Sequence, residues 1–190
     1  MPYIRKIELR GFKSFAKPVT ISLDKGFTVI TGPNGSGKTN ILDAILFVLG
    51  ELSARRMRAE NLTSLIFHGS PEAKLEKAKS AKVIIQFDNR DGRIPVETET
   101  VTISREVFRN GQCIYRLNGR KVPRGRIIDV LSMAGISFGG HNVILQGTIT
   151  RLADISSYER RKIIEDLIGI AQYDAEKAEA QEKLREAEIA

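Results

Sequence analysis

The stretch GPNGSGKT, residues 32–39, constrains this chain more than any other feature, because it matches the pattern G-x-x-x-x-G-K-[ST] in full. Its glycines let the backbone curl so that successive N–H groups point at phosphate oxygens. An apolar run, GFTVITG at 26–32, precedes the loop, and a helical pattern, KTNILDAILFVLG at 38–50, follows it. This order of strand, loop and helix is the context that the motif requires, so we predict a phosphate-binding loop in an α/β fold.

Two side chains of the loop have the chemistry that a nucleotide site needs. Lys38 can reach the β- and γ-phosphates, and the Thr39 hydroxyl can ligate Mg²⁺. The dipole of the helix that begins near Gly37 adds positive potential at the same place. A loop of this kind occurs in kinases, transport motors, switches and DNA clamps, so it does not identify the process that uses the nucleotide.

The rest of the chain alternates apolar and polar residues in a way that is typical of half-buried strands. We expect strands at 3–12, 19–23, 82–87, 96–108 and 112–117. Asn110-Gly111 and Asn118-Gly119 are strong hairpin turns, so the later strands form an antiparallel meander. A short helix is expected at 124–135, a helix with a loop at 51–70, and a strand at 142–147.

The last part of the chain, 156–190, reads as a long helix. Ser156 and Glu159 form a capping-box signature, and no Gly or Pro follows residue 171. Apolar positions with a 3-4 spacing form a short seam, which fits either the start of a coiled coil or a solvated amphipathic helix. Because the helix reaches Ala190 without a stop signal, we expect that the chain has been cut or that it continues elsewhere.

The composition narrows the possible partners and locations. The chain carries 30 Lys and Arg against 23 Asp and Glu, a net charge of +7. Seven basic residues lie between Arg105 and Arg126, and only Glu106 opposes them. Such a stretch indicates contact with a polyanion, although a solvated face is an equal alternative. With no membrane span, no signal peptide and a single cysteine, Cys113, expected to be buried, we place the protein in the cytoplasm.

An ATPase also needs carboxylates to hold Mg²⁺ and to activate water, and we searched for them. VIIQFD at 83–88 ends in Asp88, but Gln86 interrupts the apolar run and a turn follows, so an antiparallel strand is the better interpretation. SFGGHN at 137–142 resembles the serine-glycine-glycine signature of ABC-type ATPases, yet a strand pattern follows where that signature opens a helix. The nucleotide-gripping half is therefore present and the carboxylate half is absent, which suggests one side of a split domain.

Several motifs together resemble those of the SMC proteins, the ATPases of condensin- and cohesin-type complexes. They are GFKSF at 11–15, GPNGSGKTN at 32–40, AILFVLG at 44–50, LSARRMRAENLTSLIFHGS at 52–70, NVILQGTIT at 142–150 and YERRKIIEDLIGIAQYD at 158–174. The resemblance covers nearly the whole chain and favours a prokaryotic SMC, archaeal more than bacterial. It implies the N-terminal lobe of a split ABC-type head at 1–160, and a neck with the first turns of the coiled-coil arm at 161–190.

The resemblance also assigns roles to single residues. It implies that ATP is bound by the loop and its flanks: Lys13, Gly32, Pro33, Asn34, Gly35, Ser36, Gly37, Lys38, Thr39 and Asn40. Thr39 and Gln146 would ligate Mg²⁺, and Gln146 would also sense the attacking water. Lys38, Gln146 and Arg58 would take part in hydrolysis, although Arg58 lies near Arg55 and Arg56 and fits a solvated basic patch as well. Contacts with the DNA backbone would come from Arg120, Lys121, Arg124 and Arg126.

The function implied is ATP-dependent head engagement and DNA organisation in chromosome condensation and segregation, in the cytoplasm and on the nucleoid. The implied partners are the C-terminal half of the same head, a second head, a kleisin subunit and DNA. We expect the chain alone to be inactive as an ATPase. Two alternatives remain: the head of a zinc-hook DNA-repair ATPase, and a free-standing P-loop kinase.

Overall fold

The computed structural model describes residues 2–136, 143–144 and 161. The chain divides into two compact units, Met1–Phe138 and Gly139–Ala190. The expected boundary at 160/161, the coiled-coil seam and Gln146 lie outside the described residues. Of the strand expected at 142–147 only Val143 and Ile144 are described, and neither belongs to a strand. No described helix is long and apolar enough to cross a membrane.

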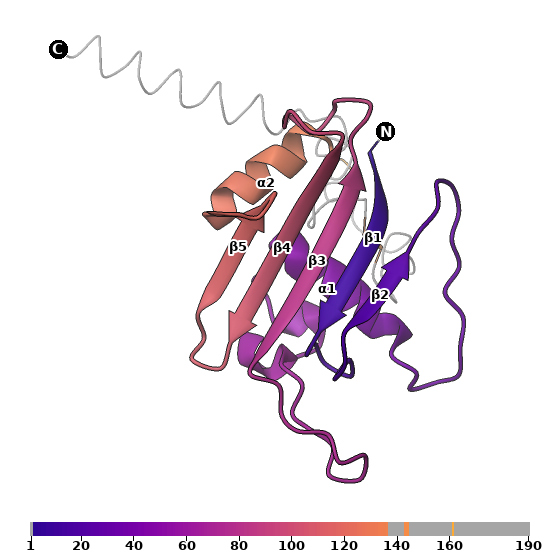
Figure 1. Cartoon of the computed structure of the whole chain (residues 1–190), viewed down its shortest axis with the longest axis vertical. Coiled ribbons are helices and arrows are strands. Elements are labelled where there is room, and N and C mark those ends of the chain that lie inside the picture. Colours follow the sequence, from indigo (N-terminus) through magenta and orange to yellow (C-terminus); the bar gives the residue numbers. More distant parts are fainter. Residues whose placement is uncertain (1, 137–142, 145–160, 162–190) are drawn as a thin grey trace, which may run out of the picture. The chain divides into compact units, whose positions relative to one another are not determined.

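The first unit is built on a six-stranded sheet in which every pair of neighbours is antiparallel (Figure 1). Its order is β2-β1-β3-β4-β5-β6. The strands are β1 (Tyr3–Arg10), β2 (Val19–Ser22), β3 (Ser80–Asp88), β4 (Thr100–Phe108), β5 (Cys113–Leu117) and β6 (Arg120–Val122). The expected meander is confirmed, with the Asn-Gly pairs between β4 and β5 and between β5 and β6.

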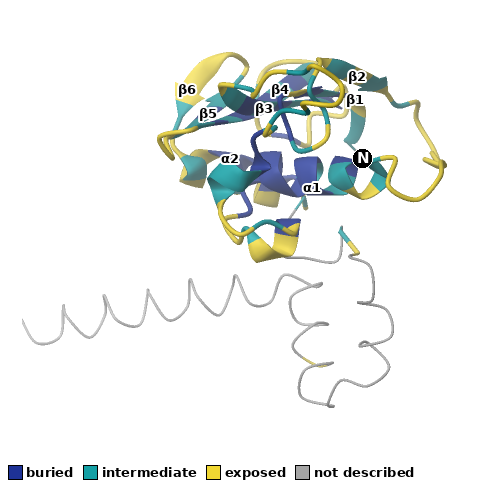
Figure 2. Cartoon of the chain, turned by 90° about the horizontal axis from the view of Figure 1, so that it is seen from below, coloured by how far each residue is buried: buried dark blue, intermediate teal, exposed yellow. Residues whose placement is uncertain are grey.

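Two helices, α1 (Lys38–Leu49) and α2 (Arg124–Met133), lie on one face of this sheet, which gives two layers (Figure 2). The alternation of the strands explains the arrangement, because every second residue of β3 turns a fully buried side chain to the helices, as Val83 and Ile85 do. Helix α1 contributes Ala44, Phe47 and Val48 to the same core, and all three are fully buried. The core of the unit is therefore the space between α1 and the central strands.

Short 3₁₀ turns, η1 (Arg55–Met57) and η2 (Leu62–Leu65), occupy the region where a helix and a loop were expected. The backbone N–H of Phe67 donates to the carbonyl of Gly11, and that of Lys13 donates to the carbonyl of Leu65. These two bonds join the GFKSF segment to the segment after η2. Two stretches far apart in the sequence thus meet beside the start of α1.

The strand expected at 26–32 is not present, so that prediction was wrong. Residues 24–37 form no strand; the side chain of Phe27 is 94% exposed, that of Val29 is 63% exposed, and Ile30 is exposed too. A continuous apolar run is typical of a strand that is covered on both faces and paired on its edges. None of the six strands of the described sheet pairs with this run (Figure 1), and all of its residues are exposed.

Candidate nucleotide site

The loop of residues 32–37 leads directly into α1, as the motif requires. Gly35 has a φ of 80° and Gly37 a φ of 92°, in the left-handed region that favours glycine. A Cβ on Gly37 would also lie 3.0 Å from the Ser14 Oγ, so the loop and the GFKSF segment meet here without room for a side chain. No described side chain caps the N-terminus of α1. The N–H of Asn40 donates to the Gly37 carbonyl, which leaves the N–H groups of Lys38 and Thr39 for a ligand.

Lys38 is the first residue of α1 and bends back over the loop. Its Nζ donates to the carbonyl of Gly32 and to the carbonyl of Pro33, both at 2.7 Å. Thr39 follows with an exposed side chain. The amine is thus held at the centre of the loop by two weak, neutral acceptors, which an anionic oxygen can replace because charge-assisted hydrogen bonds are stronger.

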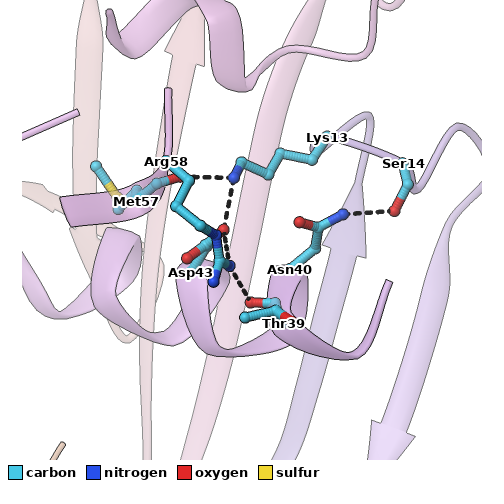
Figure 3. Close-up of polar contacts among 7 residues, drawn as sticks. All are labelled: Lys13, Ser14, Thr39, Asn40, Asp43, Met57 and Arg58. Atoms are coloured by element: carbon cyan, nitrogen blue, oxygen red, sulfur yellow. Dashed lines mark hydrogen bonds and ion pairs between the residues drawn. The ribbon is translucent and has the colours of Figure 1, made fainter. Parts of the chain in front are cut away.

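The GFKSF segment forms one wall of the site. Phe12 is fully buried and its ring packs against that of Phe47 on α1, with the centroids 5.4 Å apart. The Asn40 Nδ2 donates to the Ser14 Oγ at 2.8 Å, which ties the segment to the first turn of α1 (Figure 3). Lys13 is therefore placed beside α1, and its expected contact with the phosphates stays a prediction.

The side chain of Lys13 points at a carboxylate that the sequence interpretation did not single out. Its Nζ donates to the Asp43 Oδ2 at 2.5 Å and to the Met57 carbonyl at 2.5 Å (Figure 3). The Arg58 Nη2 donates to the same Oδ2 at 2.6 Å and to the Thr39 carbonyl at 2.9 Å. Two of the residues expected at the nucleotide thus converge on Asp43, one turn along α1 from Thr39.

Asp43 could have been found in the sequence by its position. It is the one charged residue within the apolar run of ILDAILFVL, residues 41–49, and its side chain is buried with 2% exposed. A buried carboxylate is costly unless it is paired with a cation. The signal was therefore an ionisable residue on the core face of a helix, with its partners unknown from the sequence alone.

Comparison with known proteins places these features in a family. The model for the RecF/RecN/SMC N terminal domain matches residues 3–140. The "Chromosome partition protein Smc" of Pyrococcus furiosus is 51% identical over 189 residues, which cover 99% of this chain and 16% of that protein. The chain belongs to the SMC family. It spans about a sixth of the length of the curated SMC relatives that it matches.

Solved SMC structures agree with the fold. The Smc head domain from Pyrococcus furiosus with an extended coiled coil, bound to the C-terminal domain of ScpA, superposes with a TM-score of 0.87 at 51% identity, over 99% of this chain and 47% of that one. A chain from a study of ATP-driven dimerization and DNA-stimulated activation of SMC ATPases superposes with a TM-score of 0.81 at 50% identity, over 87% of this chain and 99% of that one. The predicted α/β fold, the N-terminal lobe of an ABC-type ATPase head, is confirmed.

In this SMC chain the basic stretch splits into two kinds of residue. Arg105 is fully buried: its Nη1 donates to the carbonyls of Phe47 and Glu51 at 2.9 and 2.6 Å, and its guanidinium stacks on the rings of Phe47 and Tyr115. It stabilises the core and takes no part in a charged surface. Burial of the Tyr115 side chain raises the pKa of this tyrosine.

The four residues expected to contact DNA lie on two consecutive elements. Arg120 and Lys121 are exposed on the edge strand β6, and Arg126 is exposed in the first turn of α2. Arg124 is different, because its Nε donates to the Gly50 carbonyl at 2.8 Å and so caps the C-terminus of α1. Nothing tests the assignment of the four to DNA. It remains a prediction for Arg120, Lys121 and Arg126, whereas the bond of Arg124 favours a role in capping α1.

Asp88 is the carboxylate that the sequence offered as a candidate for holding Mg²⁺. Asp88 ends β3, and its carboxylate accepts from the Nε of Arg90 in the following turn. This guanidinium holds the pKa of Asp88 below its usual range. No group of three or more His, Cys, Asp or Glu side chains that could hold a metal is found among the residues that the structure describes. The interpretation of Asp88 as a strand end is confirmed. Cys113 is only half-buried, so the expectation of a buried cysteine was wrong; its Sγ accepts from the Arg105 Nη2 at 3.8 Å.

Proposed function

We propose that this chain is the ATP-gripping half of an SMC head that drives ATP-dependent head engagement and DNA organisation in chromosome condensation and segregation. The observation that carries the proposal is the contrast around the loop. The phosphate loop and α1 are fully formed, while the apolar run that leads into the loop is unpaired and its Phe27 and Val29 face solvent. An apolar run beside a site is the feature expected where a second polypeptide segment completes the sheet.

In this proposal the missing segment is the C-terminal half of the same head, which would pair with residues 26–32 and bring the carboxylates. ATP would be held by the backbone of 32–37, by Lys38 and by the first turn of α1. Thr39 and Gln146 would ligate Mg²⁺, whose chemistry is to neutralise charge on the phosphates. Two such heads would enclose two ATP molecules, so that binding energy at the γ-phosphate becomes a conformational change.

Partners follow from the relatives by analogy. The solved head from Pyrococcus furiosus is bound to ScpA, and another study concerns ATP-driven dimerization and DNA-stimulated activation. We infer that this chain, once completed, engages a second head, contacts a kleisin of the ScpA type, and meets DNA on the backbone through Arg120, Lys121 and Arg126. A role on the nucleoid follows from DNA contact.

The experiment that tests this function is ATP hydrolysis by the chain with and without a co-expressed C-terminal head half, at one fixed salt concentration. Activity that requires the second half supports a split ATPase. Steady turnover by the chain alone, abolished by Lys38→Ala, would instead support the free-standing kinase-like alternative. A head that turns over ATP but whose activity is stimulated by a nuclease partner and not by a kleisin would favour the zinc-hook repair ATPase.

A further inference from the structure

Asp43 is the acceptor at which two loops meet α1, and the two cations on it come from opposite sides. Lys13 belongs to the GFKSF segment and Arg58 to the residues after η1. Both donate to the same oxygen, Oδ2, of a side chain that is 2% exposed (Figure 3). Two cations share one carboxylate, so this cluster has one positive charge more than it has negative charges.

The two cations are not equivalent. The side chain of Lys13 is 12% exposed, and its Nζ is fixed between Oδ2 and the carbonyl of Met57. The side chain of Arg58 is 45% exposed, and its second bond goes to the carbonyl of Thr39 in the first turn of α1. Lys13 is thus the more enclosed of the two partners, while Arg58 lies at the surface and beside the start of α1.

The backbone at both positions is unusual. Lys13 has a φ of 48° and Arg58 a φ of 51°, in the left-handed region that residues with a side chain rarely adopt. Such conformations persist where the surroundings hold them, and they concentrate at ligand clamps and switches. The chain therefore keeps both residues in strained conformations that aim their side chains at one carboxylate.

The charges on the cluster indicate which of the two cations can leave Asp43. If Arg58 moves away, Lys13 still neutralises Asp43, so no buried carboxylate is left unpaired. If Lys13 moved, a buried ammonium would lose both of its acceptors. The arrangement permits the transfer of one cation only, and it is the one nearest to the loop.

We propose that Asp43 is a positioning residue that holds Arg58 in the nucleotide-free protein and releases it to the phosphates of bound ATP, while Lys13 stays on the carboxylate. The proposal rests on the proposed function, in which the loop binds ATP. It assigns Lys13 to Asp43 instead of to the phosphates. Because Asp43 competes with ATP for Arg58, it lowers ATP affinity, and its removal raises that affinity.

The test is a double-mutant cycle on the ATP dissociation constant, in the head formed by this chain with its C-terminal half. Asp43→Asn is expected to bind ATP about fivefold more tightly, near the lower end of coupling between sites. Arg58→Ala binds more weakly, and in that background Asp43→Asn changes the affinity by less than about twofold. Asp129→Asn, an exposed carboxylate on α2, is the matched control and leaves the affinity unchanged.

Three results separate this proposal from its alternatives. A merely structural Asp43 would make Asp43→Asn bind ATP more weakly, which overturns the proposal. Tighter binding that persists in the Arg58→Ala background means simple repulsion between the carboxylate and the phosphates, and it also overturns the proposal. If neither the wild-type head nor any variant binds ATP, the proposed function itself has failed.

A second measurement does not depend on the folding of the variants. A crystal structure of the wild-type head with a non-hydrolysable ATP analogue is expected to show the Arg58 guanidinium on a phosphate oxygen and the Lys13 Nζ still on Asp43. An Arg58 that stays on Asp43, or a Lys13 that moves to the phosphates, contradicts the proposal.

Discussion

The two ends of α1 are each surrounded by basic side chains, but those side chains do opposite things. At the C-terminus, Gly50 adopts the left-handed conformation, Arg105 donates to the carbonyls of Phe47 and Glu51, and Arg124 donates to that of Gly50. At the N-terminus, no side chain caps the helix and the loop before it is exposed. Positive charge at a helix C-terminus is favourable by itself, whereas at the N-terminus it is favourable only with an anion.

This difference separates structure from function within one helix. At the C-terminal end, Arg105 and Arg124 donate to the carbonyls of Phe47, Gly50 and Glu51, so both cations already have acceptors within the protein. The N-terminal end holds Lys38 and Arg58 on neutral carbonyls or on a shared carboxylate, where a phosphate can compete for them. Mutations at the first end should change stability, and mutations at the second should change nucleotide binding.

The largest effect is expected for Arg105→Ala, at the C-terminal end of α1. The substitution removes the arginine donor from the Glu51 carbonyl and from the Phe47 carbonyl, which keeps the Gly50 N–H. It also opens a cavity between Phe47 and Tyr115, so the free energy of unfolding should fall by about 3–5 kcal/mol. Urea unfolding of the head formed with the C-terminal half measures it, with the exposed Arg10→Ala as control. A decrease in the free energy of unfolding below about 1 kcal/mol would mean that the C-terminal end of α1 does not depend on this arginine.

Lys38→Ala, at the N-terminal end of α1, should have the next largest effect. ATP affinity should fall by about 100-fold, the size of one or two charge-assisted hydrogen bonds. Since the acceptors of this amine in the described part of the chain are two loop carbonyls, the free energy of unfolding should change by less than about 0.5 kcal/mol. Nucleotide titration and urea unfolding of the same sample test both statements. Lys25→Ala, an exposed lysine before the loop, is the control that should change neither.

The exposed basic residues of β6 and α2 provide a third test, because they differ from the buried Arg105. Replacing Arg120, Lys121 and Arg126 together by Ala should weaken DNA binding by about tenfold and reduce the slope of log K against log salt by about 3, one for each lost phosphate contact. Titrations of double-stranded DNA at several salt concentrations give both values. An unchanged slope would assign these side chains to a solvated face.

The smallest effect is expected for Arg124→Ala, which separates capping from DNA contact within the same stretch. Loss of its bond to the Gly50 carbonyl should lower the free energy of unfolding by about 1 kcal/mol. The salt slope of DNA binding should stay the same. If the salt slope falls and the free energy of unfolding does not, Arg124 belongs to the DNA-binding surface and does not stabilise the C-terminus of α1.

Local patterns predicted most of this fold. Alternation gave the expected strands, and the Asn-Gly pairs placed the hairpins, because both depend on neighbouring residues. The three-residue strand β6 was missed, since its residues Arg120 and Lys121 are charged and it pairs only through the second hairpin. The strand expected at 26–32 failed for the opposite reason: its residues suit a strand, but pairing needs a partner that the described sheet does not provide.

The position of the loop directly before α1 could be predicted, because the motif is local, whereas its binding of phosphates stays a prediction. The Asp43 cluster could not, because its members are 30 and 15 residues apart along the chain and meet only through the fold. Nor could the sequence tell Arg105 from Arg126: the first lies in a strand that faces α1 and the second in an exposed helical turn. Charge counts along a stretch do not show which charges are buried.

The difference between the two ends of α1 is tested most directly by amide hydrogen exchange of the completed head, with and without Mg²⁺ and ATP. Nucleotide should slow exchange in the loop and first turn of α1, residues 32–41, and leave residues 46–51 unchanged. Equal protection at both ends, or protection at the C-terminal end alone, would contradict it.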